Sequence, residues 1–139
     1  MNNKPSTTIH KAVMLIDDND IDNFINEKII KDCYFAENVY IHSNTNSALA
    51  FLKKMLQTNN LTKELIPAYI FLDINMPIMD GFYFLEEFEK LPTELKSFIK
   101  ITMLTPSSNL LDVEKALKYK QVLSFLHKPL TESDLENLQ

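Results

Sequence analysis

Hydrophobic positions along this chain alternate between short continuous runs and helical stripes. Each of five mostly apolar runs is followed by a segment in which apolar residues recur every three or four positions. Continuous runs are typical of strands that are covered on both faces, whereas the three-to-four spacing is typical of amphipathic helices. We therefore predict strands over residues 11–17, 38–42, 68–73, 98–104 and 122–126.

A predicted helix follows each strand. The first begins near Asp20, and the last begins at Thr131, which is spaced from Asp134 as in a capping box. Asp80 is the expected N-cap of the third helix. The apolar stripe of the first helix consists of Ile21, Phe24, Ile25 and Ile29. The later helices are predicted over residues 47–56, 81–91, 109–119 and 131–138.

Five strand–helix repeats predict an α/β fold. Strands separated by helices pair in parallel through right-handed crossovers, and their apolar character indicates helices on both faces. The expected architecture is a doubly wound five-stranded parallel sheet, in which sites form beyond the carboxyl ends of the strands. We assign residues 1–10 to a polar N-terminal tail and residues 11–139 to one domain.

Composition narrows the class of protein. A length of 139 residues fits one domain, and a net charge of −5 without clustered basic residues argues against binding to nucleic acid. The single cysteine, Cys33, excludes an internal disulfide and fits a reducing compartment. The polar N-terminus and the lack of a long apolar run argue against a secretion signal and a membrane span, so we expect a cytoplasmic protein.

Chemically active side chains gather at the predicted strand ends. Each of them has an ordinary interpretation when it is considered alone. The Asp17-Asp18 pair could cap a helix, and Asp73 could cap a turn. Thr105 could be an ordinary strand-end hydroxyl, and Lys128 a solvated lysine. Brought to one edge of a sheet, three carboxylates would repel one another and require a cation, and oxygen ligands suit Mg²⁺. The residues are Asp17, Asp18, Asp73, Thr105 and Lys128.

These residues, together with the sequence "DINMPIMDG" around Asp73 and the Lys128-Pro129 pair, resemble the receiver domain of two-component response regulators. The resemblance covers about residues 11–138 and is strongest for stand-alone, chemotaxis-regulator-like receivers. It implies a flavodoxin-like (βα)5 sheet with the strand order 2-1-3-4-5. It also implies that Asp73 accepts a phosphoryl group from a phosphohistidine on a sensor histidine kinase or a phosphotransfer protein.

The resemblance further implies a magnesium site. Asp18 and Asp73 would bind Mg²⁺ directly, Asp17 would act mainly through water, and the backbone carbonyl of Asn75 would add a ligand. Charge neutralisation of this kind is required before a carboxylate can attack a phosphoryl group.

Three further residues are implied to respond to the phosphoryl group. Thr105 would hydrogen-bond it, Lys128 would pair with it from a cis Lys128–Pro129 peptide, and Phe125 would turn inward as the switch residue. A purely structural core role for Phe125 remains the alternative. Pro106 departs from the family because it removes a backbone donor next to Thr105, whereas His127 is expected to point outward.

The expected function is that of a single-domain response regulator. It would catalyse only its own phosphorylation and dephosphorylation, and its phosphorylated form would bind an unknown downstream protein or pass the phosphoryl group along a relay. Since only residues 131–139 follow the Lys128-Pro129 pair, we expect no effector domain in this sequence. The alternatives are a small Mg²⁺-dependent phosphatase or phosphotransferase, although Asn75 stands where one such family needs a second aspartate, and a scaffold that is not phosphorylated.

Overall fold

Five parallel strands form the centre of the molecule, which a computed structural model describes for residues 8–57, 63–74, 76, 81–105 and 110–138. The strands lie in the order β2-β1-β3-β4-β5, and every neighbouring pair is parallel. This order confirms the predicted doubly wound, flavodoxin-like sheet. The strands are β1 (His10–Ile16), β2 (Ala36–His42), β3 (Tyr69–Asp73), β4 (Lys100–Thr105) and β5 (Val122–His127).

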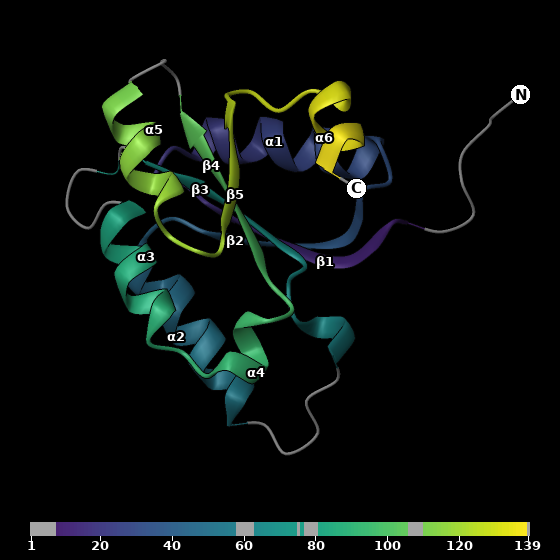
Figure 1. Cartoon of the computed structure of the whole chain (residues 1–139). Coiled ribbons are helices and arrows are strands. Elements are labelled where there is room, and N and C mark those ends of the chain that lie inside the picture. The colour runs from purple at the N-terminus through teal and green to yellow at the C-terminus, as the bar shows by residue number, and fades with distance from the viewer. Residues whose placement is uncertain (1–7, 58–62, 75, 77–80, 106–109, 139) are drawn as a thin grey trace, which may run out of the picture.

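Helices cover both faces of this sheet (Figure 1). Val13 and Leu15 of β1 pack on the side of α1 and α6, whereas Met14 and Ile16 pack on the side of α2, α3 and α5. Both sets are buried, which explains why the strand appears in the sequence as a continuous apolar run. Among the described residues, no helix is long and apolar enough to span a membrane. The helices are α1 (Asp20–Asp32), α2 (Thr45–Leu56), the short 3-10 helix η1 (Lys63–Leu65), α3 (Gly81–Glu89), α4 (Thr93–Lys96), α5 (Leu110–Leu117) and α6 (Glu132–Leu138).

Some boundaries differ from the sequence prediction. The short helices η1 and α4 were not predicted, because three or four residues cannot display a helical period. Strand β4 begins at Lys100, later than predicted, because the amide of Ile99 still donates to the carbonyl of Lys96 in the turn after α4. Strand β1 begins at His10, which was predicted to belong to the tail, since its amide pairs with the segment before β2.

Side-chain caps fix the starts of α2 and α6. Asn44 caps α2 by accepting a hydrogen bond of 2.7 Å from the amide of Ser47. The predicted capping box of α6 is present: the amide of Thr131 donates to Asp134 at 3.0 Å, and the amide of Asp134 donates to Thr131 Oγ1 at 3.1 Å. Asp80, the expected cap of α3, lies outside the described residues.

Three of the four residues in the predicted apolar stripe of α1 are exposed, whereas the fourth, Ile29, packs against the core. The exposed fractions of Ile21, Phe24 and Ile25 are 70%, 67% and 39%. The stripe therefore predicted the helix correctly but does not mark its buried side. The buried side is formed by Asn23, Asn26 and Ile30. Polar side chains take these positions because α1 packs beside the loops at the carboxyl edge of the sheet.

Candidate functional site

The carboxyl end of β3 carries a buried aspartate. Asp73 is 2% exposed and pairs in register with Leu104 of β4. The next amide, that of Ile74, donates to the carbonyl of Leu104 at 3.2 Å. The pairing with β4 therefore continues past the aspartate and fixes its backbone. β1 and β3 are neighbours in the sheet although β2 lies between them in the chain. Asp73 therefore lies at the switch in strand order, where sites of doubly wound sheets form.

The loop after β1 brings two further carboxylates to the same edge. Asp17 is 1% exposed, and its Oδ1 accepts a hydrogen bond of 3.0 Å from the amide of Asn19. Asn19 in turn caps α1 by accepting from the amides of Ile21 and Asp22, at 3.0 Å each. These contacts fix the turn between β1 and α1, so the position of Asp17 is set by the start of the helix.

Asp17, Asp18 and Asp73 form the predicted acidic cluster. One carboxylate oxygen from each of the three lies within 4.8 Å of the others. Oxygen ligands of one octahedral Mg²⁺ lie roughly 3–4 Å apart, so small side-chain adjustments would bring this set onto a single ion. The residues present therefore fit Mg²⁺, and Asp18 is the exposed member of the cluster. Asn75, the expected source of a carbonyl ligand, lies outside the described residues.

Lys128 forms three ion pairs, two of them with members of this cluster. Its Nζ lies 2.9 Å from Asp17 Oδ2, 2.9 Å from Asp22 Oδ2 and 3.6 Å from Asp73 Oδ2. The Lys128 side chain is only 10% exposed. Burial by itself lowers the pKa of the ammonium, but the hydrogen bonds to Asp22 and Asp17 and the charges of Asp73 and Asp17 outweigh burial and raise the pKa above its usual value. Lys128 therefore carries its charge at neutral pH.

The backbone around Lys128 aims this side chain inward. The Lys128–Pro129 peptide is cis, as expected from the resemblance. The amide of Lys128 donates to the carbonyl of Thr105 at 3.0 Å, and the amide of Leu130 donates to Oδ1 of the buried Asn26 at 2.9 Å. The segment around Lys128 is thus hydrogen-bonded to β4 through the amide of Lys128 and to α1 through the amide of Leu130.

Three residues of α1 escaped the sequence prediction. Asp22 pairs with Lys128, Asn23 Nδ2 donates to the carbonyl of Asp17 at 2.8 Å, and Asn26 holds the segment after the lysine. The local sequence pattern did not identify them, because apolar side chains usually mark the buried face of a helix and polar residues are then expected on its exposed face.

The expected switch residues lie on β4 and β5. Thr105 ends β4 and is 2% exposed. Phe125 is partly buried and packs against the core on the side of α2, α3 and α5. Its ring contacts that of His127, with centroids 6.2 Å apart, and His127 is exposed, as expected. Pro106 lies outside the described residues.

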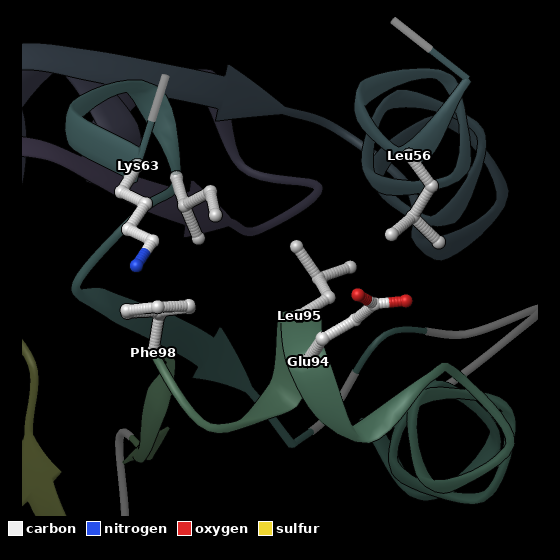
Figure 2. A pocket seen from close by; sticks show the side chains of 6 residues that line it. Leu56, Lys63, Glu94, Leu95 and Phe98 are labelled. Atoms are coloured by element: carbon white, nitrogen blue, oxygen red, sulfur yellow. The ribbon is translucent and has the colours of Figure 1, made fainter. Parts of the chain in front are cut away.

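A separate hollow lies at the opposite edge of the sheet. It has a volume of about 230 Å³, and its lining comes from α2, from η1 and the segment leading into β3, and from α4 and the turn after it (Figure 2). Figure 2 shows the ammonium of Lys63 beside the ring of Phe98, and their separation is 5.3 Å from Nζ to the ring centroid. Because these segments lead into the amino ends of β3 and β4, the hollow is not part of the acidic site.

Comparison with known proteins identifies the family. Residues 13–138 match the family model of the response regulator receiver domain. The chain therefore belongs to the receiver-domain family of two-component response regulators. Receiver domains are signalling modules that interact with histidine kinases or phosphotransfer proteins and generally bind Mg²⁺ at an acidic pocket. No curated protein matches the chain.

Solved structures agree with this assignment. A two-component response regulator from Cytophaga hutchinsonii is 30% identical, with a TM-score of 0.81 and coverage of 93% of each chain. A response regulator receiver protein from Dyadobacter fermentans is 23% identical, with a TM-score of 0.78 and coverage of 92% of this chain and 94% of that one. The chemotaxis response regulator CheY4 of Vibrio cholerae is 21% identical, with a TM-score of 0.70 and coverage of 93% and 95%. Because the sequence identities of the last two structures are low, their similarity to this chain supports the fold alone.

Proposed function

We propose that Asp73 accepts a phosphoryl group from the phosphohistidine of a sensor histidine kinase or phosphotransfer protein, in a reaction that requires Mg²⁺. The observation that carries this proposal is the convergence of one buried ammonium, on Lys128, with the carboxylates of Asp17 and Asp73. The phosphorylated form would then bind a downstream protein differently or pass the phosphoryl group onward. We assign this activity to one domain over residues 11–139 and place it in the cytoplasm, where a free Cys33 is stable.

The proposed step is an in-line displacement at phosphorus. A carboxylate oxygen of Asp73 forms the new bond to phosphorus, the bond from phosphorus to the histidine nitrogen breaks, and its electron pair stays on the imidazole. Lys128 offsets the negative charge of the incoming group. Mg²⁺, when held by Asp18, Asp73 and the Asn75 carbonyl with Asp17 acting through water, would supply the remaining neutralisation.

Thr105 and Phe125 are the proposed route from phosphorylation to partner binding. Thr105 ends the strand next to Asp73, so its hydroxyl is suited to hydrogen-bond a phosphoryl oxygen. Phe125 is partly buried and borders the core, so a movement of Thr105 would change the packing around its ring. Phosphorylation would favour one of two packing arrangements through these contacts.

Direct phosphoryl transfer to Asp73 is expected in a simple assay. The protein is incubated with Mg²⁺ and acetyl phosphate, and its mass is measured. We expect one added phosphoryl group on the parent chain and none on Asp73→Asn, because the amide cannot form the acyl phosphate. Asp32→Asn, which neutralises an exposed aspartate at the end of α1, is the matched control and should be phosphorylated like the parent.

The outcomes of this assay separate the alternatives. Absence of added mass with acetyl phosphate and with phosphorylated sensor kinases would contradict the proposal and leave the scaffold interpretation. Rapid turnover of acetyl phosphate or other small phosphate esters, with Asp73 as the phosphorylated intermediate, would instead favour the small-molecule phosphatase.

A surface for a protein phosphodonor lies beside the site. The first turns of α1 carry both Asp22, which pairs with Lys128, and the exposed apolar residues Ile21, Phe24 and Ile25. A donor that presents its phosphohistidine to Asp73 must cover this part of the molecule. An exposed apolar group next to a charged site is typical of protein interfaces. We therefore assign donor docking to these three exposed apolar residues of α1.

Phe24→Ser tests this assignment. We expect transfer from an autophosphorylated sensor kinase that phosphorylates the parent to slow about tenfold or more, because an apolar anchor at an interface contributes about 1–2 kcal/mol. Phosphorylation by acetyl phosphate should be unchanged. Leu123→Ser, which removes an exposed apolar side chain from β5, is the control. If both variants slow transfer from the kinase equally, or if Phe24→Ser does not slow it, then α1 is not part of the docking surface.

A further inference from the structure

Lys128 is held by a carboxylate that belongs to neither the β1 loop nor β3. Asp22, in the first turn of α1, accepts a hydrogen bond of 2.9 Å from Lys128 Nζ. Asp17 accepts a second bond of the same length, whereas Asp73 lies 3.6 Å away, beyond hydrogen-bond length. The ammonium is therefore bound most closely to the two carboxylates that are not expected to be phosphorylated.

We propose that Asp22 is a positioning residue that restrains Lys128 in the unphosphorylated protein and thereby sets how strongly the site holds a phosphoryl group. This inference rests on the proposed function of Asp73. A phosphoryl group on Asp73 needs the ammonium as its counter-charge, and Asp22 competes for it. Asp22 also adds a negative charge near the position of the incoming anion.

The exposure of the two partners makes this competition reversible. Asp17 is 1% exposed, so separating it from Lys128 would leave a buried charge without its partner. Asp22 is 32% exposed, and water can solvate its carboxylate after the lysine moves. Lys128 would therefore release Asp22 rather than Asp17 when a phosphoryl group arrives.

Asp22 should have the opposite effect on the cation. By drawing Lys128 toward α1, it reduces the competition between the ammonium and Mg²⁺ for Asp17 and Asp73. Its own charge also attracts the cation. Removal of this carboxylate should therefore weaken Mg²⁺ binding in the absence of a phosphoryl group, and strengthen the binding of an anion once Mg²⁺ is saturating.

Two titrations on the full chain test this inference. The first measures Mg²⁺ binding without an anion, and the second measures binding of beryllofluoride, a phosphoryl mimic, at saturating Mg²⁺. For Asp22→Asn we expect Mg²⁺ to bind about two- to fivefold more weakly and beryllofluoride about two- to fivefold more tightly, the range for losing one partly exposed ion pair. Asp22→Glu, which keeps the charge, should return both affinities toward those of the parent.

Asp20→Asn is the matched control, because it removes the same charge from an exposed residue in the same turn of α1. We expect both of its affinities to stay near those of the parent. A merely structural role of Asp22 would move both affinities in the same direction. Beryllofluoride binding by Asp22→Asn that equals or falls below that of Asp20→Asn would overturn the inference alone. Failure of the parent chain to bind beryllofluoride would overturn the proposed function and the inference together.

Discussion

Lys128→Met should lower the free energy of unfolding by about 3 kcal/mol in the absence of Mg²⁺, the scale for removing one partner of a buried ion pair. The side chains of Lys128 and of its partners Asp17 and Asp73 are 10%, 1% and 3% exposed. Methionine fills a similar volume but leaves these carboxylates without their counter-charge. The loss should appear in a urea titration at neutral pH with a chelator present.

Mg²⁺ should recover much of this loss, because a cation on the carboxylates takes over part of the neutralisation. We therefore expect Mg²⁺ to raise the stability of Lys128→Met by more than it raises that of the parent. Lys11→Met is the control, since Lys11 forms a surface pair with Glu37 and is itself about half exposed. Equal stability of Lys128→Met and Lys11→Met in chelator would show that the buried carboxylates do not depend on Lys128.

Gly81→Ala should destabilise the protein by about 2 kcal/mol, within the usual range for overpacking. A Cβ at this position would lie 2.9 Å from the carbonyl oxygen of Asp73 and 3.2 Å from the Cα of Ile74. Both contacts are with backbone, so relief requires a shift of α3 or of the end of β3. Because that backbone carries Asp73, we also expect weaker binding of beryllofluoride.

Helix propensity acts in the opposite direction at this position. Alanine is favoured over glycine by about 1 kcal/mol inside a helix and by less at Gly81, the first residue of α3, so a variant without the clash would be slightly more stable than the parent. A stabilised Gly81→Ala would therefore contradict the close contact. Gly81→Val should be worse than Gly81→Ala, since its side chain is larger. Glu86→Ala, on the exposed side of α3, is the control and should leave stability nearly unchanged.

The two asparagines of α1 illustrate how site residues escape sequence reasoning. Asn23 and Asn26 are 3% and 0% exposed, and they bond to the backbone of Asp17 and Leu130. Nothing in the local pattern separates them from surface asparagines, because their partners are backbone groups of the loops at the sheet edge. Leu130 is 104 residues from Asn26. Such partners become apparent only when the loops at the sheet edge are placed against the helix.

The sequence by itself determined the sheet, its covering helices and the acidic cluster. Strands buried on both faces must be apolar throughout, and parallel pairing brings their carboxyl ends to one edge, so the order of residues along the chain is enough to group Asp17, Asp73 and Lys128. The family resemblance supplied the strand order and the cis peptide between Lys128 and Pro129.

The tertiary structure decided which face of α1 is buried and which carboxylates hold Lys128. Local periodicity shows that a helix is amphipathic, but the face turned inward depends on what lies beneath it. Here the loops of the site lie beneath α1 and offer backbone groups to Asn23 and Asn26, whereas Ile21 and Phe24 remain outside. The choice of Asp22 as a partner of Lys128 likewise follows from the packing of α1 against a segment 106 residues away in the chain.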